Sequence, residues 1–466
     1  MELRKRMLKP AETLEEVYQT LSNEPLMKKE ELEAFYRDQV NEVRGGDKMI
    51  RLQHGLERAY HGLPFKALLA GHPGVGKSTE LTKLSVRMED KYCPIRFSAT
   101  SELNPVTFQP FDILLLMMAE VAERTARPKA EGGAGEAPSE NLLKEIWNWF
   151  AEEVKTATTF TQVGATIDAG IGISGESWWA KALGLFASLK GEIKYSADRE
   201  KKIIEYRLNR LSDLISLANK LLDECNHLLW NSVDKEWLFI GEDFDKPGIS
   251  PAQIKALFID NANILKDLRA HLIFTIPVTL AYSEQQPQLP ALHYSILDIP
   301  VYDQNHRVHK EGCAAVQAVL QARIDPKLFG QGQMNRLIIA SGGNLRDLFT
   351  LASESAENAL IRNSKKIAKI DVTRAINNLR TEYVRRLGES PFDKEKIVYD
   401  SKAELLERIY NRAEKSNVPN PILHSLIRAR VVQEFNDTNW YGVHPLVVDI
   451  LKEQKVLPGD APGGTE

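Results

Sequence analysis

The clearest chemistry in the sequence lies in one glycine-rich stretch, which begins at Gly71 and ends at Ser78. This stretch matches GxxxxGK[ST] in every required position, between an apolar run (65–70) and a helical stretch (78–88). Glycines let backbone N–H groups converge on phosphates, and the helix N-terminus adds partial positive charge. We expect Lys77 to reach the outer phosphates and the Ser78 hydroxyl to coordinate Mg²⁺. The predicted Mg-ATP-binding residues are Gly71, His72, Pro73, Gly74, Val75, Gly76, Lys77, Ser78 and Thr79.

A second stretch supplies acidic groups at the end of a buried strand. The apolar run 237–240 is followed by Gly241, Glu242, Asp243, Phe244 and Asp245. Ligands bind at the carboxyl ends of strands in open α/β sheets, where one carboxylate can hold the metal and a neighbour can orient the attacking water. We assign Glu242 to the metal and Asp243 to the water, with Asp245 as the alternative for either role. Glutamate replaces the usual aspartate at the metal position, which is compatible with slow hydrolysis.

The remaining patterns predict the architecture around these residues. Further strands are expected at 94–98, 271–277 and 295–300, with an apolar helix at 111–124. Strands that alternate with helices favour a parallel sheet. The predicted fold class is α/β, a P-loop NTPase with a doubly wound parallel sheet, a helical lid and a C-terminal winged-helix-like domain.

The length of the chain, 466 residues, favours more than one domain. We predict an N-terminal helical lead-in over 1–46, followed by a P-loop ATPase core over 47–302. A segment of hairpin and helices, 126–230, interrupts this core. The helical lid then spans 303–390, the winged-helix-like domain 391–457 and a disordered tail 458–466.

The inserted segment contains an unusual pattern at 162–174, where apolar or small residues alternate with polar or small ones. A period of two is typical of a strand, so we expect a strand or hairpin there. Trp178 and Trp179 follow, ahead of an apolar stretch. This element could pack internally, pair with a protein partner or meet a membrane surface. Internal packing is the preferred interpretation.

The stretch from Asp47 to Leu360 resembles the AAA+/STAND branch of P-loop ATPases, close to its Orc/Cdc6-like and prokaryotic defence-associated members. The resemblance implies that Thr275 is the polar sensor 1 residue. It also implies that Arg346, within Ser341-Gly-Gly-Asn-Leu-Arg-Asp-Leu348, is sensor 2 and reaches the γ-phosphate from the lid. The catalytic set expected on this basis is Lys77, Asp243, Glu242, Thr275 and Arg346, and the metal ligands are Ser78 with Glu242 or Asp245.

The sequence departs from a ring-forming AAA+ motor in one respect. Such a motor usually carries an arginine finger that completes a neighbour's site, but no arginine lies between Tyr282 and Pro300. Arg307 and Arg323 lie further along and could substitute, although surface arginines are more often solvated or paired. The departure favours a STAND-like switch over a motor.

Composition excludes few partners. The formal net charge of −4 gives no global attraction to nucleic acid or membrane, so a local patch would be needed. One such patch is the stretch 361–390, which carries eight Lys or Arg against three Asp or Glu and includes Arg380, Arg385 and Arg386. It could contact nucleic-acid phosphates or form a solvated face of the lid. Three dispersed cysteines and the lack of a signal sequence or long apolar run predict a cytoplasmic protein without stable membrane insertion.

The preferred interpretation is an ATP-binding, ATP-hydrolysing regulatory switch. It would use ATP and Mg²⁺, form a homo-oligomer and relay its state to a separately encoded effector protein, by family analogy in antiviral defence. Two alternatives stay open. One is a DNA-binding loader ATPase that contacts nucleic acid through its C-terminal domain, and the other is a non-hydrolysing, ATP-dependent assembly scaffold.

Overall fold

The structure is a computed structural model of the whole chain. It describes residues 7–458, apart from 156–161, 173–176, 196–200, 247, 391–392, 394–395, 414–417 and 436–439. Within this part of the chain, the helices are too short or too polar to cross a bilayer. The expected disordered tail falls almost wholly outside the described residues.

The centre of the molecule is a five-stranded sheet in the order β2-β3-β4-β1-β5, with every neighbouring pair parallel. The strands are β1 (Lys66–Ala70), β2 (Tyr92–Ser98), β3 (Glu236–Glu242), β4 (His271–Thr275) and β5 (Leu292–Ser295). The strand predicted at 295–300 was misplaced, since only Ser295 belongs to β5. Ile296 still donates a backbone hydrogen bond to Ala70, at 2.9 Å, before the chain leaves the sheet.

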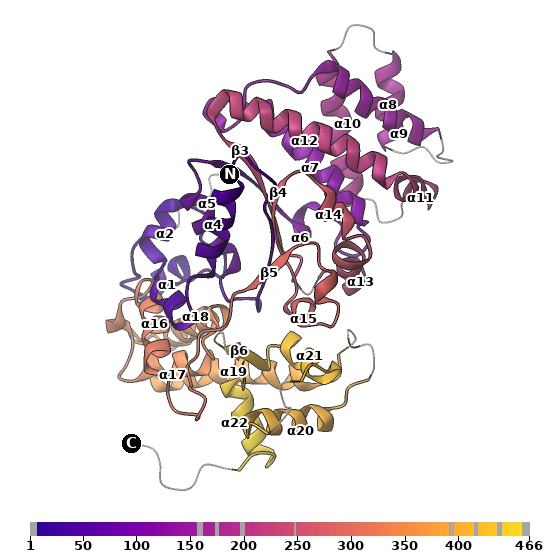
Figure 1. Cartoon of the computed structure of the whole chain (residues 1–466). Coiled ribbons are helices and arrows are strands. Elements are labelled where there is room, and N and C mark those ends of the chain that lie inside the picture. Colours follow the sequence, from indigo (N-terminus) through magenta and orange to yellow (C-terminus); the bar gives the residue numbers. More distant parts are fainter. Residues whose placement is uncertain are drawn as a thin grey trace.

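Helices cover both faces of the sheet, as a doubly wound fold requires (Figure 1). Helices α4 (Lys48–Ala59) and α5 (Lys77–Arg87) pack on one face, in a core that includes Leu69. Helices α7 (Pro110–Thr125) and α12 (Leu211–Val233) pack on the other face, in a core that includes Leu68. Successive side chains of a strand point to opposite faces, so the apolar run of β1 serves both cores. The predicted α/β fold class is confirmed.

Short helices connect these elements and begin the chain. The predicted helical lead-in is divided into α1 (Leu14–Thr20), α2 (Lys29–Phe35) and α3 (Gln39–Val43). Helices α6 (Ala99–Glu102) and α15 (Val278–Ala281) follow the ends of β2 and β4, while α13 (Pro251–Lys255) and α14 (Asn263–Asp267) lie in the connection from β3 to β4. The predicted lid, 303–390, contains α16 (Lys310–Gln321), α17 (Gln333–Ala340), α18 (Leu345–Ile361) and α19 (Lys369–Leu387).

The inserted segment is helical. It contains α8 (Glu140–Val154), α9 (Gln162–Gly172), α10 (Trp178–Tyr195) and α11 (Lys201–Asn209). The strand predicted at 162–174 was therefore wrong over its described residues, and 173–174 lie outside them. Val163 and Ile167 of α9 are buried, and a spacing of four places them on one helix face while also satisfying a period of two. Gly170 lies so close to Trp147 that an added Cβ would come within 2.4 Å of the ring.

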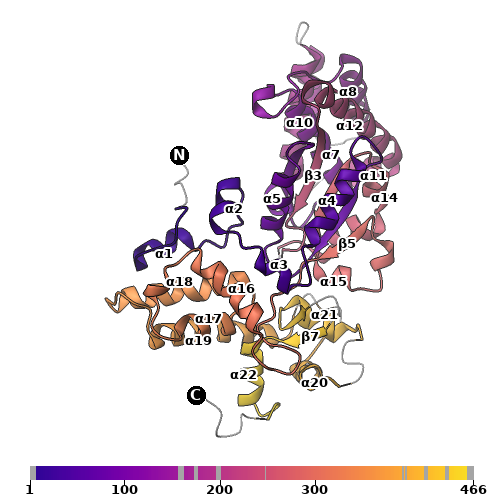
Figure 2. The ribbon, with the colours of Figure 1, turned by 60° about the vertical axis from the view of Figure 1, so that its left-hand side comes forward.

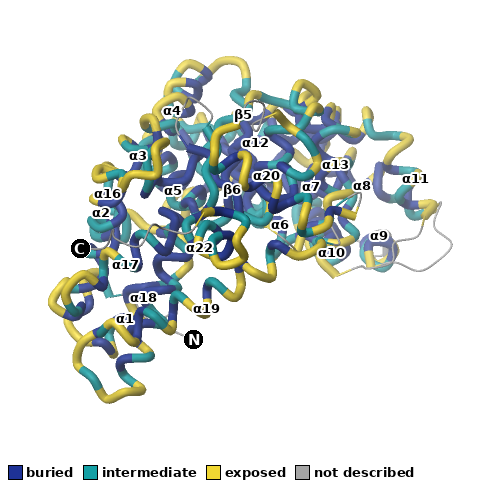
Figure 3. Tube along the Cα trace, turned by 90° about the horizontal axis from the view of Figure 1, so that it is seen from below, coloured by how far each residue is buried: buried dark blue, intermediate teal, exposed yellow. Residues whose placement is uncertain are grey.

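The C-terminal segment follows the order helix, helix, hairpin, helix. Its elements are α20 (Tyr399–Tyr410), α21 (Pro421–Arg428), the antiparallel pair β6 (Val432–Phe435) and β7 (Trp440–Val443), and α22 (Pro445–Glu453). Its assignment as a winged helix stays a prediction. Figures 1 and 2 place this segment and the insertion at opposite ends of the molecule, with the sheet between them. Figure 3 shows that the buried residues gather in the middle and the exposed ones follow the rim.

Candidate nucleotide site

The glycine-rich loop connects β1 to α5, as predicted, and it is held by its carbonyl groups. Gly74 (φ 93°) and Gly76 (φ 99°) adopt left-handed backbone that favours glycine. A Cβ on Gly74 would also come within 2.5 Å of the Asn344 side chain. Asn344, which caps lid helix α18, donates to the Pro73 carbonyl at 3.1 Å. The loop is therefore fixed by contacts with the lid as well as by its own sequence.

Lys77 lies at the base of this loop with its ammonium group buried. Its Nζ donates to the carbonyls of Gly71 at 2.7 Å and His72 at 2.9 Å. The same atom lies 2.9 Å from Oδ2 of Asp245, and both side chains are less than a tenth exposed. Asp245, which follows the end of β3, thus lies beside the phosphate loop. This ion pair places the ammonium group where a phosphate oxygen would compete with a carboxylate for it.

Asp243 and Asp245 both line the cleft with Lys77. Asp243 has a left-handed backbone (φ 69°), which is uncommon for a residue other than glycine. Its Oδ2 accepts a hydrogen bond from Ser98 Oγ at 2.5 Å, and its Oδ1 lies 3.0 Å from the Lys246 ammonium. The carboxylate is consequently held in one orientation at the end of β3, where a water-orienting group is expected.

Glu242 has a different environment from its two acidic neighbours. It is buried, and its Oε1 forms an ion pair with Arg96 of β2, whose Nε lies 2.8 Å away. Arg96 also donates to Thr82 Oγ1 at 2.7 Å and to the Ser78 carbonyl at 3.2 Å. Glu242 therefore lies behind the start of α5, neutralised by an arginine. The metal role assigned to Glu242 stays a prediction, and this arrangement favours the alternative, Asp245.

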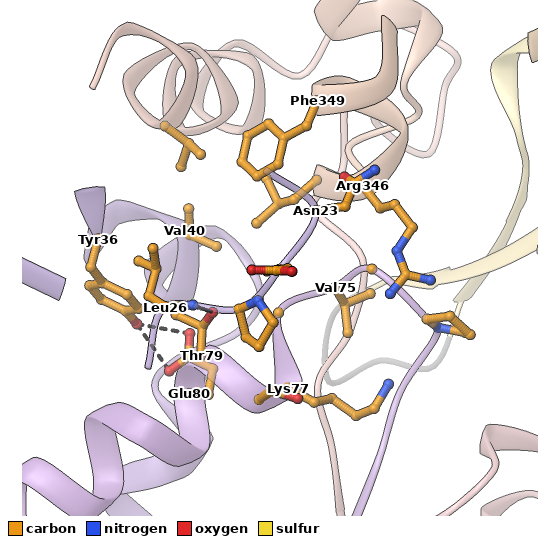
Figure 4. Close-up of a pocket in the computed structure, with 18 of the residues that line it drawn as sticks. Asn23, Leu26, Tyr36, Val40, Val75, Lys77, Thr79, Glu80, Arg346 and Phe349 are labelled. Atoms are coloured by element: carbon orange, nitrogen blue, oxygen red, sulfur yellow. Dashed lines mark hydrogen bonds between the residues drawn. The ribbon is translucent and has the colours of Figure 1, made fainter. Parts of the chain in front are cut away.

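The two predicted sensor residues line the same cleft. Thr275, the last residue of β4, is buried, and among the described residues its hydroxyl finds no hydrogen-bond partner. An unpaired buried hydroxyl is costly, so an oxygen-rich ligand in the cleft would satisfy it. Arg346 reaches the cleft from α18, as Figure 4 shows. Burial, and then the nearby Arg430, lower the pKa of Arg346, while Asp245 and Asp243 oppose the shift.

The opposite end of the cleft is apolar and comes from residues that the sequence motifs did not indicate. Leu26, Val40 and Phe349 line it, so the N-terminal lead-in and the lid face each other there (Figure 4). Tyr36 donates to both carboxylate oxygens of Glu80, at 2.8 and 3.0 Å. An apolar wall beside a few oriented polar groups is typical of a site for a nucleoside. No local pattern marks these residues, because they come from three separated stretches of chain.

A buried His–Asp pair connects the phosphate loop to the chain that follows β5. His72 Nδ1 lies 2.5 Å from Oδ2 of Asp298, which follows β5. Although burial alone would raise it, the pKa of Asp298 is lowered by His72 and by the Arg44 guanidinium. Arg44 is itself buried and donates to the Val75 carbonyl at 2.8 Å. His72 stays a predicted nucleotide-binding residue, and the structure shows that its side chain pairs with Asp298.

The structure also places the arginines considered as a substitute finger. Arg323 is buried in its own chain's cleft, where its guanidinium lies 5.0 Å from the ring centroid of Phe35 and 4.7 Å from that of Phe349. It donates to the Phe35 carbonyl at 3.1 Å. This position is wrong for a residue that must reach a neighbour's site. Arg307 is exposed on the loop before α16.

The oxygen donors of the cleft suit magnesium. Ser78, Asp243 and Asp245 supply hydroxyl and carboxylate oxygens beside the phosphate loop. Over the described residues there is no cluster of three or more His, Cys, Asp or Glu that could hold a metal alone. Magnesium is usually bound by one or two protein groups together with phosphate oxygens and water. The residues present therefore fit a metal that arrives with a nucleotide.

Comparisons with known proteins find only distant structural similarities. No family model and no curated protein matches the sequence. Among solved structures, the Orc1 protein of Aeropyrum pernix in complex with DNA is 13% identical, with 88% of this chain and 92% of that chain covered and a TM-score of 0.37. The Thermotoga maritima RuvB Holliday junction branch migration motor is 10% identical, with 91% of this chain and 100% of that chain covered and a TM-score of 0.35. Drosophila ORC bound to DNA is 10% identical, with 99% of this chain and 84% of that chain covered and a TM-score of 0.38.

These similarities concern the fold alone. The chain itself supplies a five-stranded parallel sheet and a complete phosphate loop between β1 and α5. Together they identify the fold as that of a P-loop NTPase.

Proposed function

We propose that this protein binds Mg-ATP in the cleft between the phosphate loop, the N-terminal lead-in and the lid, and hydrolyses it. The observation that carries the proposal is the position of Lys77. Its ammonium group lies at the loop, 2.9 Å from Asp245, in a cleft that also holds the unpaired Thr275 hydroxyl and Arg346. Cations and hydrogen-bond donors converge there on one place, as transfer of a phosphoryl group requires.

Each residue has a distinct role in this proposal. The loop amides and Lys77 hold the β- and γ-phosphates, and Arg346 contacts the γ-phosphate from the lid. Bound magnesium would be held by Ser78 and Asp245 and would neutralise charge on the phosphates. Asp243, fixed by Ser98 and Lys246, orients the attacking water, and the Thr275 hydroxyl donates to the same water or to the γ-phosphate.

Loss of the lysine ammonium tests the binding step. We expect Lys77→Ala to weaken Mg-ATP binding at least a hundredfold in calorimetry, because the strongest charge-assisted contact to the phosphates is removed. Lys220→Ala is the matched control, since Lys220 pairs with Glu145 in the insertion, 2.5 Å away and outside the cleft. Equal affinity of the parent and Lys77→Ala for Mg-ATP would refute the proposed site.

We propose further that hydrolysis sets a regulatory state that is passed to a separately encoded effector. Support comes from Arg346, which lies on the lid and is therefore suited to report the γ-phosphate to the rest of the molecule. A homo-oligomer is part of this proposal, and the antiviral role rests on family analogy alone. Size-exclusion chromatography with light scattering, with and without Mg-ATP, tests whether the oligomeric state follows the nucleotide.

The DNA-loader alternative depends on the basic helix α19. Two of its arginines already have partners: Arg380 pairs with Glu453 of α22, and Arg386 lies 3.3 Å from Glu382. Paired arginines attract phosphates less than unpaired ones do. Salt-dependent DNA binding that is lost on charge reversal of Arg380, Arg385 and Arg386 would support this alternative.

A further inference from the structure

One residue of the C-terminal segment reaches the nucleotide site from outside every motif found there. Arg430 lies between α21 and β6, and its backbone is left-handed (φ 59°), a conformation uncommon for residues other than glycine. Its side chain is only 13% exposed. An arginine whose side chain is largely removed from solvent, in such a backbone conformation, requires specific partners.

The partners of Arg430 belong to the phosphate loop and to the start of lid helix α18. Its Nη1 donates to the Pro73 carbonyl at 3.2 Å and to Asn344 Oδ1 at 3.3 Å. Its Nη2 donates to Asp347 Oδ1 at 3.1 Å, and the other oxygen of Asp347 accepts from Tyr383 at 2.7 Å. One planar guanidinium therefore joins three parts of the chain through two of its nitrogens.

This contact completes the fixation of the loop. The Pro73 carbonyl accepts from Arg430 and from Asn344, while the Val75 carbonyl accepts from Arg44 in the N-terminal lead-in. Carbonyls that are held by these donors fix the backbone of a loop that lines the cleft, and a fixed backbone can present its amides to phosphates. The two guanidinium groups come from opposite ends of the sequence and act on the same loop.

We propose that Arg430 is a positioning residue of the nucleotide site, through which the C-terminal segment sets the affinity of the phosphate loop. The inference rests on the proposed function. Docking of the segment orders the loop and the capping residue Asn344, so docking and nucleotide binding favour each other by the same factor. A partner that pulls the segment away would weaken nucleotide binding.

The experiment compares Arg430→Ala, Arg430→Lys and the control Arg428→Ala in the full chain. Arg428 is an arginine of the same segment, but its ion pair is with Asp393, away from the loop. For Arg430→Ala we expect about tenfold weaker binding of both Mg-ADP and Mg-ATP, because the loop serves phosphates that the two nucleotides share. Arg430→Lys should recover part of this loss, and Arg428→Ala should bind like the parent.

Hydrogen exchange without nucleotide separates this inference from the proposed function. Arg430→Ala should speed exchange of the loop amides between Gly74 and Lys77, while the amides of α20 and α22 keep the protection seen in the parent. Parent-like loop exchange in Arg430→Ala would overturn the inference, whether or not the parent binds nucleotide. Equal losses of affinity in Arg430→Ala and Arg428→Ala would also overturn it, because the cause would then be general destabilisation. Failure of the parent to bind nucleotide would refute the proposed function alone.

Discussion

Two regions of the molecule bury charged side chains, and they do so in different ways. In the insertion, the fully buried Arg207 forms two hydrogen bonds to Glu153, at 2.7 and 2.8 Å, and one to Glu192 at 2.8 Å. Although burial alone would lower it, the pKa of Arg207 is raised by these two carboxylates. In the nucleotide cleft, by contrast, the buried charges share one cavity with a hydroxyl that lacks a described partner, that of Thr275.

The contrast shows that burial of a charge does not by itself indicate function. Arg207 donates its hydrogen bonds to partners within the insertion. Its guanidinium also lies 5.4 Å from the ring centroid of Phe111. Such a group stabilises one arrangement of helices. The groups around Lys77 face a cleft, so their charges can act on a ligand. A charged cluster is a candidate site when its polar atoms face a cavity.

Removal of Arg207 should have the largest effect on stability and none on the nucleotide. Arg207→Ala removes the arginine that pairs with the buried carboxylates of Glu153 and Glu192, which we expect to cost about 3–5 kcal/mol of unfolding free energy. Thermal unfolding measures this loss, and calorimetry on the folded variant should show parental affinity for Mg-ATP. A variant that is stable but does not bind nucleotide would remove the distinction between the two regions.

Substitution of Asp243 should have the reverse effect. We expect Asp243→Asn to lower single-turnover phosphate release about a hundredfold, since the orienting carboxylate is lost. Nucleotide affinity should change little, and Asp260→Asn, which breaks an exposed ion pair with Lys255, is the matched control. Absence of turnover in the parent as well as in the variant would favour the assembly-scaffold alternative.

Removal of the Thr275 hydroxyl, which has no described hydrogen-bond partner, should give a smaller and more specific effect. Thr275→Val keeps the shape of the side chain and removes an unpaired buried polar group, so stability should stay the same or rise by up to about 1 kcal/mol. Phosphate release should fall about tenfold if the hydroxyl contacts the water or the γ-phosphate. Lower stability together with unchanged turnover would make Thr275 a structural residue, like those of the insertion.

The last expected effect concerns stability in acid. Burial lowers the pKa of His444 to about 4 from its ordinary 6.5. Its Nδ1 accepts from the Leu446 amide at 3.3 Å, which requires the neutral ring. The unfolded chain therefore binds this proton first, and the stability that the neutral ring contributes is present above pH 6.5 and lost as the pH falls toward 4.

His444→Asn tests this assignment, because asparagine can accept the same hydrogen bond but does not titrate. Between pH 7 and pH 4.5, the unfolding temperature of the parent should fall more steeply than that of the variant. Parallel pH profiles would show that His444 does not contribute to acid sensitivity.

The sequence by itself determined the parts that depend on neighbours along the chain. The loop from Gly71 to Ser78, the helix after it and the acidic end of β3 were predicted because backbone conformation and helix polarity are set by adjacent residues. The alternating faces of the sheet followed from an apolar run that serves two cores. These features predicted the fold class, which the structure confirms, and the proposed site for the phosphates.

The tertiary structure decided what adjacent residues do not specify. Arg430 and Pro73 are separated by 357 positions, and no local pattern indicates that they meet. The alternation at 162–174 was compatible with two periods, and the structure shows a helix over Gln162–Gly172 in which Gly170 packs closely against Trp147. Side chains far apart in the sequence come together only when whole elements dock, and docking depends on the shape and burial of entire surfaces.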